Sequence, residues 1–424
     1  MNRPSFAWRT AAVLGAACLT LAACSNDGDT PSTGSSSAAT GGSAVGDGTL
    51  KFGTLLPQTG SLAFLGPPEF AGVDAAIKEI NAAGGVLGKQ VSVSHTDSGD
   101  TSTQIASQSV NKLLTEKTDV IIGAASSSVS LSVIDAITGA GVMQISPANT
   151  SDAFTSYDDK GLYFRTAPPD VLQGRVLGNQ IVQDGKATVG LLVIQDAYGT
   201  GLAKSTRAAI ESGGGQVVAE EVYDPKAADY SAEVGKIKQA NPDAIVLIGF
   251  DETKKIVPKL VENGLTSKAK QWYLVDGNLA NYGKEFPNGT FDGAKGTLPG
   301  AASSADFKKK LADVNPDLKD YSYAPESFDA TIVAALAAEA AKSDTPTDIA
   351  KQMTAVTSGG TKCTTFKECK DALTAGTDID YDGVSGPVEF DQAGDPSQAT
   401  IGIYQYGADN TYKNLTYQAG SITG

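Results

Sequence analysis

Apolar and polar residues follow two periods along the first third of the chain, and these periods predict strands and helices in turn. Residues 50–56 are mostly apolar, as expected of a buried strand, whereas residues 68–83 carry apolar side chains at helical spacing. A strand over 90–97, a helix over 103–117 and a strand over 120–122 follow. This β-α-β order predicts a parallel sheet with helices on both of its faces.

The same alternation begins again after Thr166. Predicted strands and helices succeed one another through residues 171–275, with strands over 188–194, 216–222, 244–248 and 270–275. Further helices are predicted over 307–314, 328–341 and 349–355, and a last strand over 401–406. Two similar α/β units in one chain suggest two lobes around a cleft.

Residues 120–150 place two polar loops beside each other. An apolar run ends at Gly123 and gives way to Ser126, and a second run, 142–145, gives way to small polar residues up to Thr150. In a parallel sheet such breaks fall at the carboxyl ends of strands, where ligands bind. A helix N-terminus next to hydroxyls suits an anion such as a carboxylate. The strand ends of the second unit carry Tyr198, Phe250 and Asp276 instead.

Charge and composition exclude several classes of function. The 424 residues carry a formal net charge of −15, which argues against a nucleic-acid binder. His95 is the only histidine, and its alternating strand pattern favours a solvent-facing residue over a catalytic one. The sequence contains no Gly-x-Ser-x-Gly elbow, no P-loop and no metal-ligand cluster. We therefore expect no catalytic residue, no metal and no cofactor.

The N-terminus predicts export. Residues 1–23 carry Arg3 and Arg9 before a short apolar run, as a secretory signal peptide does. Their end, Leu21-Ala22-Ala23-Cys24, resembles a bacterial lipobox, which implies cleavage before Cys24 and a lipid on its sulfur; the alternative is an ordinary signal peptide with a chance cysteine. The Ser/Gly-rich residues that follow Cys24, up to residue 48, predict a flexible tether.

Two further cysteines, Cys363 and Cys369, lie close together in the sequence. In an exported chain they predict a small-loop disulfide with a structural role. A zinc site would need partner ligands that the sequence lacks.

Several motifs together resemble the leucine/isoleucine/valine-binding-protein family, the type I periplasmic-binding-protein fold of ABC importers. They are, in order, Gly60 to Gly66, residues 76–88 (AIKEINAAGGVLG), the Ser126 loop, residues 145–150 (ISPANT) and residues 163–167 (YFRTA). The likeness extends over roughly residues 50–412. It implies two doubly wound α/β lobes, the first formed by 49–166 and 297–400 and the second by 167–296 and 401–424. Three crossings near Thr166, Thr297 and Ile401 would form a hinge that closes around a ligand.

The resemblance also implies a set of ligand-binding residues. Ser126 and Thr150 match hydroxyls that hold a ligand carboxylate, Ala148 matches a carbonyl for the ammonium, and Asp276 matches the acidic residue, usually Glu, that pairs with it. Tyr198 matches a tyrosine from the second lobe, and Leu65, Phe250 and Tyr323 match pocket walls. From the residues alone, Ser126 is equally a helix N-cap and Asp276 a turn former. Asp276 is also one methylene shorter than the usual Glu.

The function that this resemblance implies is a lipid-anchored extracytoplasmic receptor, monomeric and non-catalytic. It would capture a branched-chain or related amino acid and deliver it to the permease subunits of an ABC importer. Leu65 and Phe250 depart from the aromatic and tyrosine that are common at their positions, so the side chain of the ligand stays open. The alternative is a sensing receptor of the same fold for an amide or another small polar solute.

Overall fold

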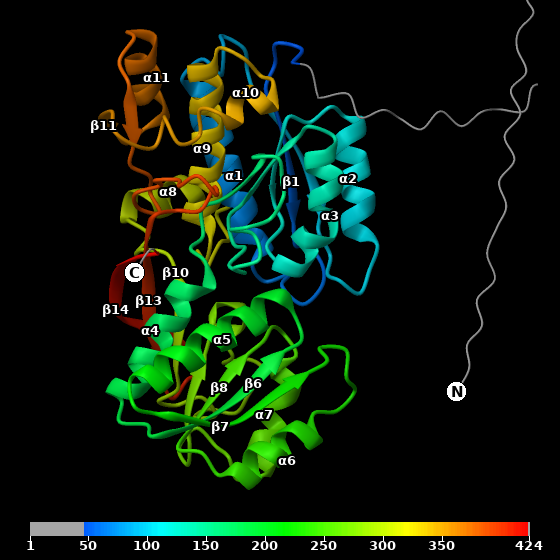
Figure 1. Ribbon diagram of the computed structural model, residues 1–424, viewed down its shortest axis with the longest axis vertical. Helices are drawn as coiled ribbons and strands as arrows, with labels where there is room; N and C mark the ends of the chain where they lie inside the picture. The colour runs from blue at the N-terminus through cyan, green and yellow to red at the C-terminus, as the bar shows by residue number, and fades with distance from the viewer. Residues whose placement is uncertain (1–45, 423–424) are drawn as a thin grey trace, which may run out of the picture. The chain divides into compact units, whose positions relative to one another are not determined.

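Two sheets, one parallel and one mixed, form the two lobes of the protein, and each is flanked by helices (Figure 1). The computed structural model describes residues 46–422. The predicted signal peptide, Cys24 and nearly all of the tether lie outside these residues. The α/β class and the two doubly wound lobes predicted from the sequence are confirmed.

The first lobe is built on a five-stranded parallel sheet in the order β2-β1-β3-β4-β5. Its strands are β1 (Lys51–Leu56), β2 (Ser92–Asp97), β3 (Val120–Gly123), β4 (Met143–Ser146) and β5 (Tyr163–Arg165). The helices between them are α1 (Gly66–Ala82), α2 (Ile105–Thr115) and α3 (Ser127–Gly139). Helices α2 and α3 pack on one face through a core that includes Leu113 and Val133. Central strands buried on both faces explain why residues 120–122 are continuously apolar.

The other face of this sheet is covered by helices from distant parts of the chain. Besides α1 they are α8 (Ala305–Ala312), α9 (Ala324–Ala341), α10 (Pro346–Ala350) and α11 (Phe366–Thr374). Helix α9 is buried along nearly its whole length, as its Ala-rich sequence predicts. It packs closely on α1 because Gly72 has no side chain; a Cβ there would lie 2.3 Å from the Ala324 carbonyl oxygen.

The predicted pair Cys363 and Cys369 forms a disulfide in a small excursion from this lobe. Cys363 ends β11 (Thr361–Cys363), which pairs with β12 (Ile379–Tyr381), and Cys369 lies in α11. Thr365 caps this helix by accepting a hydrogen bond from the Glu368 amide at 3.2 Å. The sequence pattern predicted neither the two strands nor the helix of this excursion.

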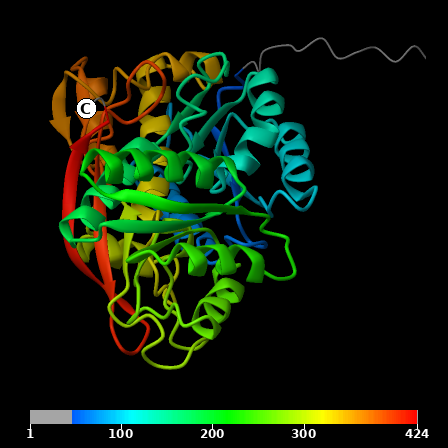
Figure 2. The same ribbon diagram turned by 60° about the horizontal axis from the view of Figure 1, so that its bottom comes forward.

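The second lobe contains a seven-stranded mixed sheet in the order β14-β13-β10-β9-β8-β6-β7. Its strands are β6 (Thr188–Ile194), β7 (Gln216–Tyr223), β8 (Ala244–Ile248), β9 (Gln271–Leu274), β10 (Lys295–Pro299), β13 (Gln398–Tyr406) and β14 (Tyr412–Ser421). Its helices are α4 (Asp170–Gln183), α5 (Ala197–Ser212), α6 (Ser231–Ala240), α7 (Thr253–Glu262) and the short turn η1 (Asp276–Asn278). In Figure 2, α4 and α5 lie on one face of the strands and α6 and α7 on the other.

The edge of the second sheet differs from the sequence prediction. The strand predicted over 401–406 is not the last one, because β14 follows it and pairs with β13 in antiparallel fashion. Strand β10 continues to Pro299, so Thr297 lies in this second sheet, and β13 already begins at Gln398. Strand β14 is largely exposed, and its backbone hydrogen bonds to β13 rather than an apolar face hold it in the sheet.

The chain passes from one sheet to the other three times, near Thr166, Gly300 and Thr400. These connections contact one another or Glu326. The Thr166 hydroxyl donates to the Glu326 carbonyl oxygen at 2.9 Å. The Gly300 amide donates to the Thr400 carbonyl oxygen at 2.8 Å, and a Cβ on Gly300 would lie 2.7 Å from the Glu326 carboxylate. The Glu326 side chain is buried, and burial raises its pKa to about 8, with Asp329 adding to the rise.

This buried carboxyl makes stability depend on pH. Because the pKa of Glu326 is raised in the folded state, the folded protein binds more protons than the unfolded chain between about pH 4.5 and 8, so stability falls as pH rises through that window. From pH 5 to pH 8, Glu326 should lower the unfolding free energy of the wild-type protein by about 3 kcal/mol. In Glu326→Gln this part of the pH dependence should be absent. Urea unfolding at both pH values measures this, with exposed Glu262→Gln as control. An unchanged pH dependence in Glu326→Gln would contradict the prediction.

Candidate functional site

The loop after β3 begins at a glycine that the sheet requires. Gly123 has a φ of 127°, and a Cβ there would lie 2.1 Å from the Leu55 carbonyl oxygen. The chain then turns into α3, whose N-cap is Ser126; its hydroxyl accepts a hydrogen bond from the Val129 amide at 3.3 Å. The N-cap interpretation of Ser126 is therefore correct, and it leaves the hydroxyl proton uncommitted.

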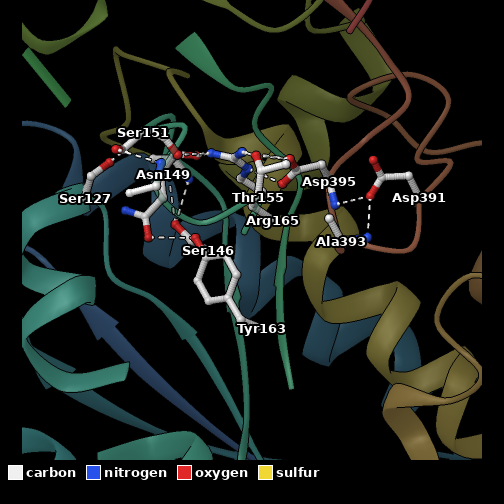
Figure 3. A network of polar contacts seen from close by, with 12 residues as sticks. Ser127, Ser146, Asn149, Ser151, Thr155, Tyr163, Arg165, Asp391, Ala393 and Asp395 are labelled. Carbon is white, nitrogen blue, oxygen red and sulfur yellow. Dashed lines mark hydrogen bonds and ion pairs between the residues drawn. The ribbon is translucent and has the colours of Figure 1, made fainter. Parts of the chain in front are cut away.

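Ser146 and Asn149 join the loop after β4 to the loop after β3. Figure 3 shows both side chains in the loop after β4. The Ser146 hydroxyl donates to the Ala124 carbonyl oxygen at 2.7 Å and accepts from the Asn149 amide at 2.9 Å. The Asn149 side-chain amide donates to the carbonyl oxygens of Ala124 and Ala125 at 3.0 and 2.8 Å. Sequence reasoning placed polar residues here without identifying these two as the ones that join the loops.

A buried ion pair holds the second loop from behind (Figure 3). The Arg165 guanidinium contacts both Asp395 carboxylate oxygens, at 2.6 and 2.9 Å, and both side chains are almost fully buried. Arg165 also donates to the Ser151 carbonyl oxygen at 2.8 Å. The Arg165 backbone amide also donates to the carbonyl oxygen of Gly394, the residue before Asp395, at 3.0 Å. One ion pair thus joins the loop after β4 to the segment that leads into β13.

The second lobe contributes two stacked aromatic rings. Tyr198 lies in the first turn of α5, which is capped by Asp196, and Phe250 follows β8. Their ring centroids are 5.5 Å apart with planes 10° from parallel. Gly277 leaves room for the Phe250 ring, because a Cβ at this position would lie 2.7 Å from that ring.

Asp276 is the polar centre of the site. One carboxylate oxygen accepts from the Tyr198 hydroxyl at 2.7 Å and from the Gln173 amide at 2.8 Å, and the other accepts from the Tyr323 hydroxyl at 2.7 Å. Burial raises the pKa of Asp276, and these three donors oppose that rise. Tyr323 belongs to the start of α9 in the first lobe, so its bond to Asp276 crosses between the lobes. A second crossing bond runs from the Ala197 amide to the Ser128 hydroxyl at 3.0 Å.

The predicted residues gather around one cavity, with one exception. Its walls include Leu65, Ser126, Ala148, Tyr198, Phe250, Asp276 and Tyr323, together with four residues that were not predicted, Leu62, Ala125, Ser127 and Gly277. Thr150 does not line it; this residue is buried, and its carbonyl accepts from the Asp170 amide at 2.7 Å. Ser127, the next residue after Ser126, lines the cavity instead, and its hydroxyl accepts a hydrogen bond from the Ser151 amide at 3.3 Å.

In this conformation the cavity holds about 10 Å³, roughly the space that one water molecule needs. It adjoins a larger opening of about 330 Å³ that shares the walls Leu62, Ser126 and Phe250. A solute of several heavy atoms therefore enters only when these walls move apart. The Tyr323–Asp276 and Ala197–Ser128 hydrogen bonds join the lobes on either side of these walls, so opening the cavity would have to separate them.

The only histidine of the chain lies at the surface of the first lobe. His95 lies on β2 with its side chain 34% exposed, 3.0 Å from Asp74. Neither His95 nor its partners Thr54 and Asp74 line the cavity, and its exposure agrees with the solvent-facing interpretation. Within residues 46–422, no group of three or more His, Cys, Asp or Glu side chains is arranged to hold a metal ion. In the same range no helix combines the length and apolar character needed to cross a bilayer.

Comparisons with known proteins agree with this architecture. A family model described as periplasmic binding protein matches residues 49–408. The Leu/Ile/Val-binding protein homolog 1 of Brucella abortus is 28% identical over 386 residues, covering 88% of this chain and 95% of its own.

Two solved structures share the fold. The branched-chain amino acid transporter substrate binding protein LivJ from Streptococcus pneumoniae, in complex with isoleucine, gives a TM-score of 0.71 at 24% identity, covering 88% of this chain and 99% of its own. An ABC transporter solute binding protein from R. palustris, in complex with benzoate, gives 0.67 at 19% identity, covering 88% and 98%.

The Arg165–Asp395 pair should carry a large share of the stability near the site. Asp395→Ala leaves the buried guanidinium without its counter-ion, which should lower the unfolding free energy by about 3–5 kcal/mol. Chemical denaturation measures the loss. Lys367→Ala is the matched control, since its pair with Asp371 is exposed and should contribute almost nothing. A loss no larger than that of the control would mean that the ion pair does not hold this loop.

Proposed function

The chain belongs to the periplasmic binding protein family of leucine/isoleucine/valine-binding proteins, and on that premise we propose that it captures a small α-amino acid between its two lobes. It is a substrate-binding protein of the ABC-transporter type. We propose a branched-chain or related amino acid as its ligand and the permease subunits of an ABC importer as its partner. It acts as an extracytoplasmic monomer, and its role is non-catalytic.

One observation carries this proposal: the cavity has chemically opposite walls. On the first lobe the Ser126 and Ser127 hydroxyls lie at the N-terminus of α3, which favours a carboxylate. On the second lobe Asp276 offers a buried negative charge, which favours an ammonium. Ala148, which follows β4 on the first lobe, also lines the cavity, and its carbonyl is the further acceptor in this proposal. An α-amino acid presents both groups on adjacent atoms and fits this polarity.

The energies are sufficient for a useful affinity. Hydrogen bonds to charged groups contribute about 1.5–3 kcal/mol each. A few of them, less the ordering cost, reach the roughly −8 kcal/mol of a micromolar complex. Leu65, Phe250 and Tyr198 would enclose the side chain of the ligand. Because groups from both lobes touch the ligand only when the lobes close, binding favours the closed state.

A second candidate is a sensing receptor of the same fold that binds an amide or another small polar solute. It is favoured by the departures at Leu65 and Phe250 and by the neighbour that was solved with benzoate, since this fold accepts ligands without an amino group. The two candidates differ in whether the ligand needs both a carboxylate and an ammonium.

A calorimetric screen of the purified protein tests the choice. We expect one or a few of the common α-amino acids, with branched aliphatic side chains foremost, to bind at micromolar concentration. The matched panel contains primary amides and aromatic acids such as benzoate. Binding of the second panel alone would favour the second candidate, and a protein that binds no amino acid would rule out the first.

We include in this proposal a lipid anchor on Cys24. It rests on the lipobox-like residues Leu21 to Cys24, which lie outside the described part of the chain. Two acyl chains on such a cysteine would hold the domain stably at the outer face of the cell membrane, with the tether up to residue 48 as spacer. Metabolic labelling with a clickable fatty acid should mark the native protein and fail on Cys24→Ser. Equal labelling of both would refute the anchor at this residue.

A further inference from the structure

The proton of the Tyr323 hydroxyl is committed to Asp276. The two oxygens are 2.7 Å apart, and a carboxylate that already receives the Gln173 amide acts as acceptor toward both. A tyrosine hydroxyl has one proton, and after donating it the oxygen can only accept. Both residues line the cavity, so this wall presents an acceptor-only oxygen as well as a charge.

Tyr198 is less available for the same task. Its hydroxyl also donates to Asp276, at 2.7 Å, but its oxygen lies 3.4 Å from the Gly277 amide, which donates to it. Tyr323 has no second hydrogen bond to its hydroxyl among the described residues. Of the two tyrosines, Tyr323 therefore keeps its acceptor capacity open toward the cavity.

The backbone at Tyr323 adopts a strained conformation. Tyr323 has φ 59° and ψ 6°, in the left-handed region that residues with a Cβ rarely adopt. Its carbonyl accepts from the Ser327 amide at 3.0 Å and the Ser327 hydroxyl at 2.8 Å, which fixes it at the start of α9. Strain that is held in place by its surroundings is typical of functional positions.

We propose that Tyr323 receives the amino group of the ligand, with the Asp276 charge acting through the Tyr323 hydroxyl, and that Gln173 is a positioning residue for this pair. This inference rests on the proposed function and deepens it. Such a wall selects solutes with an N–H donor at this end and disfavours solutes that present only oxygen acceptors there. The shorter reach of Asp276, compared with a glutamate, is thereby bridged by the tyrosine oxygen.

The experiment compares two probes that differ only in the amino group. These are L-leucine and 4-methylpentanoate, titrated calorimetrically into the wild-type protein and into Tyr323→Phe. We expect Tyr323→Phe to weaken L-leucine at least tenfold and to change 4-methylpentanoate less than twofold. Gln173→Met, which removes the donor to Asp276, should also weaken L-leucine more than 4-methylpentanoate, but by a smaller factor than Tyr323→Phe. Tyr412→Phe, outside the cavity, is the control, and thermal unfolding confirms that each variant is folded.

Other outcomes would overturn the inference. If Asp276 contacts the amino group directly, Tyr323→Phe frees one of its oxygens, and L-leucine binds equally well or better. If Tyr323 only holds the lobes together, both probes weaken by the same factor. If wild type binds another amino acid in place of L-leucine, that amino acid and its deaminated acid are the probes. A wild-type protein that binds no amino acid refutes the proposed function itself, and with it this inference.

Discussion

A buried carboxylate at the junction of the lobes constrains the rest of this structure. Asp276 is only 5% exposed, and an ion in such a place is costly unless donors surround it. Its three donors come from α4, α5 and the start of α9, each of which is distant from Asp276 in the sequence. The carboxylate therefore finds its donors where these three elements meet, and its bond to Tyr323 is one of the bonds that join the lobes.

Much of the fold was predictable because parallel strands that are buried on both faces have continuous apolar sequences. Strands β6 and β8 match their predicted bounds for this reason. Strand β14 has no such run; it is exposed on most positions and is held by backbone bonds that the side chains do not encode. The α11 excursion is similar, since a disulfide and a capping threonine replace a long apolar pattern.

The site was predictable as far as strand ends could locate it, and no further. Ser126, Phe250 and Asp276 all follow strands, so the topology brings them together. Gln173 lies inside a helix and meets Asp276 across 103 residues of sequence, so no local pattern points to it. Thr150 shows the opposite limit: a hydroxyl after a strand can turn either way, and here Ser127 takes the place on the wall.

The two interpretations of Ser126, helix cap or ligand contact, do not compete once protons are followed. As a cap, Ser126 accepts from the Val129 amide and keeps its own proton, so toward the cavity it can donate. Tyr323 donates its hydroxyl proton in the hydrogen bond to Asp276, so toward the cavity its oxygen can accept. In each case the hydrogen bond to the protein decides whether the hydroxyl can donate or accept a further hydrogen bond toward the cavity. In the proposed site this gives the cavity a donor end and an acceptor end, the polarity of a zwitterion, before any ligand enters.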